Sequence, residues 1–179
     1  MEMSKILKEI MSTLLYLVVI FGLTFLFITF VAQRTEVSGS SMEPTLQDHD
    51  SLIVDKLSYR FIEPHRYDIV IFPYQYGNNQ YFIKRVIGLP GERVRVDFDG
   101  NIYINDAKLI ENYGAEVILD PGRAETEILL GEDEYFVMGD NRNHSMDSRD
   151  ISVGNIHKKD ILGKAFVRIY PFSKFGGVE

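Results

Sequence analysis

The chain has 179 residues, of which 45% are hydrophobic, and it carries a formal net charge of −7 and no cysteine. This length provides for one well-packed domain and one membrane segment, but hardly for two independent domains. The basic residues form no run longer than two, which argues against a nucleic-acid partner. The lack of cysteine excludes disulfides, thiolate metal sites and a cysteine nucleophile.

An apolar run near the N-terminus predicts a membrane anchor. Residues 10–32 carry no formal charge, and at about 1.5 Å per residue a helix of this length crosses a hydrocarbon core of about 30 Å. A buried helix of a soluble protein normally has a polar face. A cleavable signal peptide normally has a shorter apolar region that ends at an A-x-A-like site, and this run has no good site of that kind. We therefore expect a single, uncleaved transmembrane helix.

The basic residues around this run indicate its orientation. Lys5 and Lys8 precede the run, whereas Arg34 is the only basic residue shortly after it. The positive-inside rule then places residues 1–9 in the cytoplasm and residues 33–179 on the outer side of the cell membrane. Membrane lipid is therefore an expected partner, while the oligomeric state is not predicted.

After the anchor, the sequence alternates in the manner of short β-strands separated by turns. The expected fold class is mainly β, with one transmembrane helix followed by an all-β domain. Strands are predicted at residues 51–54, 68–72, 81–87, 93–98, 102–104, 134–138 and 165–170. Asp99-Gly100-Asn101 predicts a hairpin between two of them. Residues 107–130 show weaker periodicity and are not assigned to elements.

A turn rich in serine and glycine, residues 38–45, follows the anchor closely. Such a cluster is most often a plain surface turn, because glycine and serine tolerate irregular backbone. Two features favour a functional turn. Gly39 permits a tight bend with inward-directed amides, and Met42 is an apolar side chain at what we expect to be an exposed tip. Amides in such a bend can form an oxyanion hole beside a serine hydroxyl.

Lys84 lies in the middle of the strand expected at residues 81–87. Period-two alternation puts Phe82, Lys84 and Val86 on one face of this strand. An isolated lysine of this kind is often a surface residue whose amine reaches water. Burial between apolar neighbours instead lowers the pKa of a lysine from about 10.4 and makes its amine a usable base. On the residues alone a surface lysine is the more common case, and a general base for a serine nucleophile is the alternative.

A polar loop is expected at residues 139–149, directly after a strand. It reads Gly-Asp-Asn-Arg-Asn-His-Ser-Met-Asp-Ser-Arg. One interpretation is a surface loop held by turns and an Asp–Arg pair. The other is a support for a site, in which Ser145 orients the lysine amine while Asp147 and Arg149 hold the shape of the loop. Composition alone does not decide between them.

Together these segments resemble the type I signal peptidases, membrane-bound Ser/Lys endopeptidases that remove signal peptides from exported preproteins. The matching motifs are Ser-Gly-Ser-Ser-Met-Glu-Pro-Thr-Leu at 38–46, Tyr-Asp-Ile-Val-Ile-Phe at 67–72, Tyr-Phe-Ile-Lys-Arg-Val-Ile-Gly-Leu-Pro-Gly-Glu at 81–92, and the whole loop at 139–149. Each motif is weak alone, but all four in order behind one anchor are specific. The resemblance implies a signal-peptidase-type β-domain, similar to the protease domain of the SOS repressors.

The resemblance also implies a role for each matching residue. Ser41, which precedes Met-x-Pro-Thr, would be the nucleophile, and Lys84 the general base of a mechanism without metal or cofactor. Some members carry a side-chain hydroxyl, which assists the oxyanion, at the position of Gly39. This chain lacks that hydroxyl and in this respect resembles the Gram-positive-type members. The other matching residues are Ser145 as partner of the lysine, the supporting pairs Asp147–Arg149 and Asp140–Arg85, and the substrate contacts Met42, Phe82 and Ile83.

The implied substrates are preprotein signal peptides with small residues before the cut, at an A-x-A-like site. A Ser-His-Asp hydrolase that uses His144 near Asp147 is an alternative, but the sequence has no G-x-S-x-G elbow. A zinc hydrolase would need ligand spacing such as H-E-x-x-H, which is absent. Another alternative is a soluble autoprotease of the SOS-repressor kind. Such proteins have no apolar anchor, so the run at residues 10–32 argues against it. The hypothesis of a membrane-tethered module that only binds a partner stays open, although binding alone would not require both Ser41 and Lys84.

Overall fold

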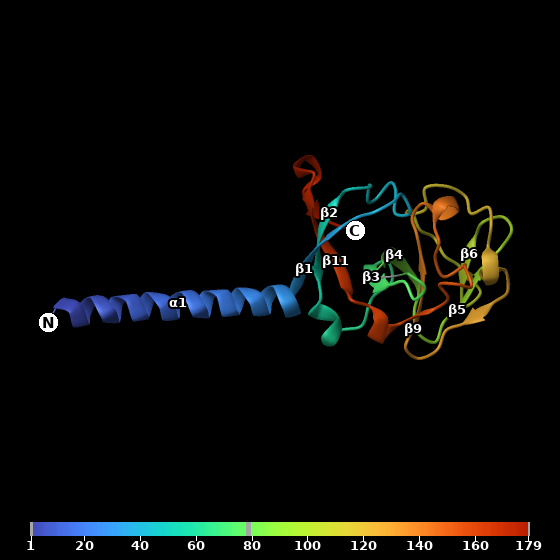
Figure 1. Cartoon of the computed structure of the whole chain (residues 1–179). Helices are drawn as coiled ribbons and strands as arrows, with labels where there is room; N and C mark the ends of the chain where they lie inside the picture. The colour runs from blue at the N-terminus through green and yellow to red at the C-terminus, as the bar shows by residue number, and fades with distance from the viewer. Residues whose placement is uncertain (1, 78–79, 179) are drawn as a thin grey trace.

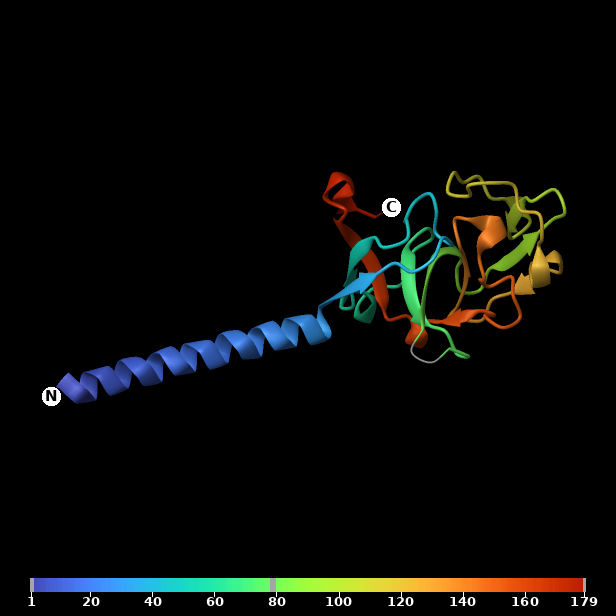
Figure 2. The same cartoon turned by 45° about the horizontal axis from the view of Figure 1, so that its top comes forward.

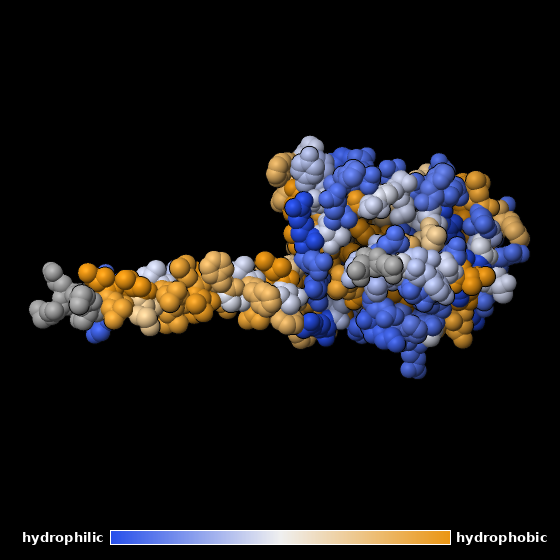
Figure 3. Space-filling model, in the orientation of Figure 1, coloured by the Kyte–Doolittle hydropathy of each residue, from blue (hydrophilic) through white to orange (hydrophobic). Residues whose placement is uncertain are grey.

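One long helix and a β-domain make up the computed structural model, which describes residues 2–77 and 80–178 (Figure 1, Figure 2). The helix α1 (Glu2–Phe30) projects away from the domain. Its segment Lys5–Phe30 reaches a mean hydropathy of 2.4 in its most apolar window, and 0% of that window is buried. Figure 3 shows this helix as a largely apolar surface beside a domain with a mostly hydrophilic face. Its length and composition suffice to cross a membrane.

The helix differs at both ends from the anchor expected at residues 10–32. It begins at Glu2 and ends at Phe30. The chain leaves the helix there because strand β1 (Ala32–Glu36) follows almost at once and pairs antiparallel with strand β2 (Ser51–Asp55). The helix therefore runs into the edge of the domain with almost no linker.

The larger sheet holds eight strands in the order β1-β2-β11-β3-β4-β9-β10, with β12 paired to β11. Its other strands are β3 (Ile69–Pro73), β4 (Tyr81–Gly88), β9 (Glu134–Met138), β10 (Ile156–His157), β11 (Gly163–Tyr170) and β12 (Gly176–Gly177). Strand β4 pairs with β3 from Tyr81 to Arg85 but with β9 from Arg85 onward. In the described part of the chain, residues 81–84 thus have one edge without a strand partner.

A smaller, four-stranded sheet lies at the end of the domain far from α1 (Figure 1). Its order is β7-β6-β5-β8, and its strands are β5 (Arg93–Val96), β6 (Ile102–Ile104), β7 (Ala107–Lys108) and β8 (Ile128–Leu129). The expected hairpin joins β5 to β6, with Val94 opposite Ile104 and Val96 opposite Ile102. Gly100 in its turn has a φ of +80°, which glycine adopts without steric cost.

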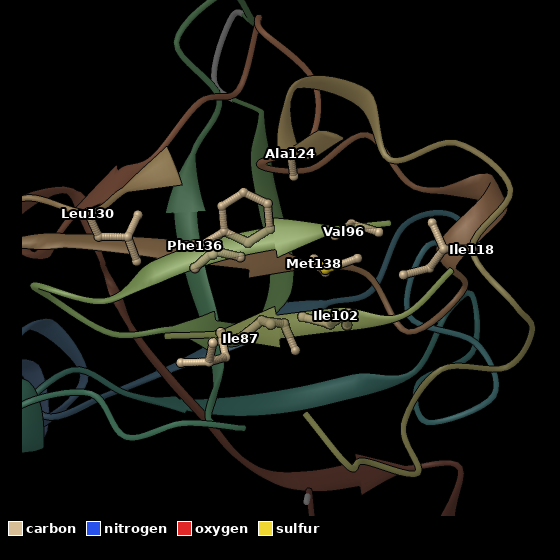
Figure 4. Packing of buried hydrophobic residues seen from close by; sticks show 10 residues of the cluster. Ile87, Val96, Ile102, Ile118, Ala124, Leu130, Phe136 and Met138 are labelled. Atoms are coloured by element: carbon tan, nitrogen blue, oxygen red, sulfur yellow. The ribbon is translucent and has the colours of Figure 1, made fainter. Parts of the chain in front are cut away.

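Buried apolar side chains join the two sheets. Figure 4 shows Val96 and Ile102 of the small sheet packed near Phe136 and Met138 of β9 and Ile87 of β4. Each such side chain contributes about 1.5–3 kcal/mol when fully buried. A second cluster lies around Leu46, Leu52 and Ile71, and a third around Val70, Val86 and Val137. Apolar packing on several sides therefore fixes the position of β4.

The predicted fold class, mainly β with one apolar N-terminal helix, is confirmed. The predicted strands correspond to β2, β3, β4, β5, β6, β9 and β11. Strand β1 was not predicted, because its sequence Ala-Gln-Arg-Thr-Glu is polar and lies at a sheet edge. The unassigned residues 107–130 supply β7, β8 and the buried side chains Ile118, Ala124 and Leu130. The 3-10 helices are η1 (Ser58–Arg60), η2 (Gly122–Glu125), η3 (Arg142–His144), η4 (Lys158–Asp160) and η5 (Phe172–Lys174).

Candidate active site

Two side chains that are distant in the sequence meet beside the middle of β4. The Nζ of Lys84 donates a hydrogen bond of 2.7 Å to the Oγ of Ser41. The same amine donates a second hydrogen bond, of 3.0 Å, to the carbonyl oxygen of Ile83. An amine at this distance from a serine hydroxyl can take its proton once the amine is neutral.

Burial of Lys84 favours the neutral amine. Only 3% of the residue is exposed, and the ring of Phe82 lies 4.9 Å from the amine. Desolvation lowers the pKa of Lys84 from 10.5 to about 8, against the opposing effect of the nearby charges on Asp147 and Asp140. With a pKa of about 8, roughly one lysine in ten is neutral at pH 7, compared with about 4 in 10,000 for a free lysine.

The turn that carries Ser41 has a backbone conformation set by glycine. Gly39 has a φ of +93°, and a Cβ added there would meet nothing within 4 Å. Conformation, and not lack of space, therefore favours glycine. The Gly39 amide donates a hydrogen bond of 2.8 Å to Asp48 Oδ1. The Ser41 amide, in contrast, donates no hydrogen bond to residues 2–77 or 80–178.

Met42 is not at an exposed tip, contrary to the expectation from the sequence. Only 1% of it is exposed, and it packs in the cluster with Val37, Leu46 and Leu52. The side chain is apolar because it anchors the turn in the core. This anchoring fixes the position of the neighbouring Ser41.

The loop at residues 139–149 is closed by an ion pair. Asp147 accepts two hydrogen bonds from the Arg149 guanidinium, both of 2.9 Å, and one of 3.0 Å from the Gly139 amide. Gly139 also approaches the turn that carries Ser41 closely. A Cβ added to it would lie 2.4 Å from the Ser41 carbonyl oxygen and 2.3 Å from Ser145 Oγ, so this contact requires glycine.

Ser145 does not make the expected hydrogen bond to the lysine amine. Its Oγ is buried and has no hydrogen-bond partner among the described residues. The loop instead reaches the Ser41 turn through Asn141, whose amide donates a hydrogen bond of 3.1 Å to the Ser41 carbonyl. The Asn141 side chain donates another, also of 3.1 Å, to the Ser40 carbonyl. Apart from its place in the loop, no sequence signal pointed to this role of Asn141.

Arg85 and Asp140 form a fully buried ion pair next to Lys84. Arg85 donates to the two carboxylate oxygens at 2.9 and 2.8 Å, and both side chains are 0% exposed. Thr45, in the Ser41 turn, donates a hydrogen bond to the same carboxylate at 2.5 Å. The guanidinium stacks 3.7 Å from the ring of Tyr113, a residue in the segment that the sequence left unassigned. The pair thus connects β4, the loop at residues 139–149 and the Ser41 turn.

A cleft of about 450 Å³ opens beside Ser41 and Lys84. The three residues expected to contact substrate, Met42, Phe82 and Ile83, line it. It is also lined by residues that the sequence did not single out, among them Thr35, Glu36, Gln80, Tyr81 and Met146. Only the order of the strands in the sheet brings these residues together, so no local pattern could reveal them.

The geometry gives no support to the alternatives based on histidine or zinc. His144 is an exposed residue of η3, and the side chain bonded to Ser41 is Lys84. Within residues 2–77 and 80–178, no group of three or more His, Asp or Glu side chains is placed to hold a metal ion.

The sequence as a whole matches one protein family. The match is to the family described as signal peptidase, peptidase S26, and it covers residues 9–170. This chain belongs to that family. The signal peptidase resemblance is thereby confirmed, and the chain is a peptidase.

Named signal peptidases are similar to this chain over most of its length. The probable signal peptidase I-2 of Synechocystis sp. is 43% identical over 153 residues, which cover 83% of this chain and 67% of the relative. Signal peptidase I U of Bacillus subtilis is 38% identical over 146 residues, which cover 77% of this chain and 76% of that relative. A crystal structure of a signal peptidase I from Enterococcus faecalis V583 is 33% identical and covers 57% of this chain and 97% of its own, with a TM-score of 0.48.

Proposed function

We propose that this signal peptidase is a membrane-bound serine endopeptidase with Ser41 as its nucleophile and Lys84 as its general base. The observation that carries the proposal is the 2.7 Å hydrogen bond between Ser41 Oγ and the buried Lys84 amine. The lowered pKa of Lys84, about 8, supports the role of base near neutral pH.

The reaction is an acyl transfer in two steps. Neutral Lys84 takes the proton of Ser41 as the serine oxygen attacks the scissile carbonyl, and the lysine ammonium then gives this proton to the leaving amine. The mature protein departs with a new N-terminus. A water molecule next attacks the acyl-enzyme while Lys84 takes its proton, and the proton returns to Ser41 Oγ as the signal peptide leaves with a new carboxylate.

The main-chain amide of Ser41 is the donor that we assign to the oxyanion. It has no hydrogen-bond acceptor among the described residues, whereas the Gly39 amide is occupied by Asp48. Gly39 therefore serves the oxyanion site through the bend of its backbone. The bonds from Asn141 to the carbonyls of Ser40 and Ser41 hold the same bend from the other side.

The substrate binds in an extended conformation along the cleft. Among the described residues, 81–84 have one edge without a strand partner, β1 is the outermost strand of the sheet, and both border the cleft. An extended peptide pairs with such edges through its backbone. Phe82, Ile83 and Met146 then limit the space beside Ser41. This arrangement supports the preference for small residues before the cut, at an A-x-A-like site in a preprotein.

The helix α1 crosses the cell membrane, with the N-terminus in the cytoplasm and the domain from residue 33 on the outer side. The apolar segment Lys5–Phe30 supports the span, and the excess of basic residues before it supports the orientation. Because β1 follows the helix almost at once, the domain is held close to the outer surface, where exported preproteins emerge.

The test uses the full-length chain in detergent and a preprotein with an Ala-x-Ala site. We expect cleavage after the last alanine, and a loss of at least about 100-fold in kcat/KM when that alanine is replaced by leucine, because the larger side chain does not fit. Ser41→Ala controls for contaminating peptidases and should show no cleavage. Efficient cleavage of the leucine substrate by the wild type would contradict the assigned specificity.

A further inference from the structure

A second cleft, of about 730 Å³, lies on the side of the domain that meets α1. We call it the basic cleft, and its lining includes Lys56, Tyr59, Arg60, Tyr81, Lys158 and Lys159. In both views the teal turn η1 lies beside the end of α1, with the orange-red turn η4 on the same side of the domain (Figure 1, Figure 2). This site is separate from the Ser41 cleft, although Tyr81 lines both.

Two contacts place one wall of the basic cleft at the end of the apolar helix. Lys56 Nζ donates a hydrogen bond of 2.9 Å to the carbonyl oxygen of Thr29, in the last turn of α1. The Arg60 guanidinium lies 5.7 Å from the ring of Phe30, the last residue of the helix. The polar layer on each side of a hydrocarbon core is only about 5–8 Å thick. With α1 across the membrane, as proposed above, both cations lie at the depth of the lipid headgroups.

The charge of the basic cleft is positive in a chain whose net charge is −7. Its four cations face two carboxylates, Asp133 and Asp160. Asp133 is paired with His157, and Lys158 with Glu63. Among the described residues, Lys56, Arg60 and Lys159 form no ion pair, and neither does Asp160. Lys56 donates its hydrogen bond to the Thr29 carbonyl, whereas Arg60 and Lys159 are exposed. Two cations are thus available to an anion from outside the chain.

The flanking side chains fit a lipid and not a soluble anion. Phe61 is 79% exposed and Ile62 is 49% exposed, directly after Arg60 in the sequence. Exposed apolar side chains beside basic ones are typical of segments that enter the membrane interface. Arginine and lysine are also the side chains that bind phosphate oxygens best.

We propose that the basic cleft binds the phosphate of an anionic phospholipid from the leaflet next to the domain, with Arg60 and Lys159 as its main contacts. The proposal rests on the membrane span of α1. The bound lipid would share the wall formed by Tyr81 with the substrate cleft, so the domain would be seated with its substrate cleft at a fixed position relative to the membrane surface.

The test measures retention of phosphatidylglycerol and of phosphatidylcholine by the detergent-solubilised full-length chain, using native mass spectrometry. The test variant is Arg60→Gln/Lys159→Gln. The matched control is Arg95→Gln/Lys108→Gln. It also removes one arginine that lies over an aromatic ring, that of Tyr103, and one exposed lysine. Both control residues lie in the small sheet, far from α1 (Figure 1). Both test side chains are exposed, so their removal should leave the fold intact.

We expect the wild type and the control to retain phosphatidylglycerol in preference to phosphatidylcholine. The test variant should bind phosphatidylglycerol at least tenfold more weakly, because each basic side chain near an anionic lipid contributes roughly fivefold in affinity. Lys159→Gln alone should weaken the binding of phosphatidylglycerol about fivefold. Equal retention by all variants, or an equal loss in test variant and control, would overturn the proposal. Displacement of the lipid by millimolar inorganic phosphate would identify a site for free phosphate and overturn it as well.

A second measurement separates this proposal from the proposed function. Cleavage of a short soluble peptide in detergent depends on Ser41 and Lys84 but not on a bound lipid. The test variant should therefore keep the peptidase activity of the wild type on this peptide. Loss of lipid retention with full activity supports the basic cleft as a lipid site, whereas full lipid retention with full activity rejects it and leaves the peptidase assignment standing.

Discussion

The Lys84 amine lies 2.7 Å from the hydroxyl oxygen of Ser41, although 43 positions separate the two residues in the sequence. Each side of this contact is held by packing. Lys84 is fixed by strand β4, and Ser41 is fixed by the buried neighbour Met42 and by the hydrogen bond from the Asn141 amide. The pair is thus assembled before any substrate arrives, as an efficient base and nucleophile require.

The pH dependence of activity should follow the deprotonation of Lys84. Burial places its pKa at about 8, and only the neutral amine can take the Ser41 proton. We therefore expect kcat/KM to rise about tenfold per pH unit below pH 8 and to level off above it. Rates measured from pH 6 to 10 on a substrate without titrating groups near the cut check this. A flat profile would contradict a lysine base.

Replacing Lys84 by methionine should stabilise the fold at neutral pH. Because the pKa of Lys84 is lowered from 10.5 to about 8, the unfolded chain binds more protons than the folded chain between these values, and the lysine destabilises the folded state below pH 8. After allowance for the lost hydrogen bond to Ser41, we expect Lys84→Met to gain about 2 kcal/mol at pH 7.

This gain should shrink as the pH rises from 8 to 10.5, because the folded lysine is then neutral and, at pH 10.5, about half of the unfolded chains also carry a neutral lysine, so most of the penalty of the buried charge is gone. Denaturant unfolding of both proteins in detergent at pH 7 and pH 10.5 measures the difference. A gain at pH 7 that persists unchanged at pH 10.5 would show that packing, and not the buried charge, is its cause.

Breaking the buried pair Arg85–Asp140 should cost far more stability than breaking an exposed pair. Asp140→Asn leaves the fully buried Arg85 without a counter-charge, for which we expect a loss of about 3–5 kcal/mol. The matched control is Asp106→Asn, which breaks the exposed pair with Arg93 and should cost less than about 1 kcal/mol. Urea unfolding of the two variants compares them, and similar losses would refute the structural role of the buried pair.

Asp48 should act as a positioning residue for the nucleophile turn. Its Oδ1 accepts the hydrogen bond from the Gly39 amide, at 2.8 Å. Asp48→Ala removes this acceptor, and we expect kcat to fall about tenfold because the turn becomes less ordered. Asp48→Asn keeps an oxygen at the same place and should retain most of the activity. The pH midpoint should stay the same in both variants, since neither contacts Lys84. A shifted midpoint, or equal losses in both variants, would contradict this role.

Local patterns in the sequence predicted most of the strands, whereas Ser41 and Lys84 were assigned to the dyad through the resemblance to the signal peptidases. Alternation identified β4 and the apolar neighbours of Lys84, because a half-buried strand has a period of two. The hairpin between β5 and β6 was predicted from Asp99-Gly100-Asn101, since such turns need residues that accept positive φ. These features depend on near neighbours in the chain.

The features that the sequence did not predict depend on tertiary contacts. Met42 was expected at an exposed tip, because most of the apolar side chains that bury it come from segments distant in the sequence, among them β2, β3 and β11. The edge strand β1 is polar, so it lacks the pattern of a buried strand. The expected bond from Ser145 to Lys84 is absent from the described part of the chain, where the amine is bonded to Ser41 and to the Ile83 carbonyl. Side-chain partners of this kind follow from backbone placement that no local pattern contains.

The most direct test of the dyad is the kcat/KM of Lys84→Arg, Lys84→Ala and His144→Ala on a preprotein with an Ala-x-Ala site. Arginine keeps a positive donor at the position of Lys84 but cannot lose its proton near pH 8. We predict that both Lys84 variants are folded and lose at least about 10³-fold in kcat/KM, whereas His144→Ala stays within about twofold of the wild type. Substantial activity in Lys84→Arg, or a large loss in His144→Ala, would contradict the assignment of Lys84 as the general base.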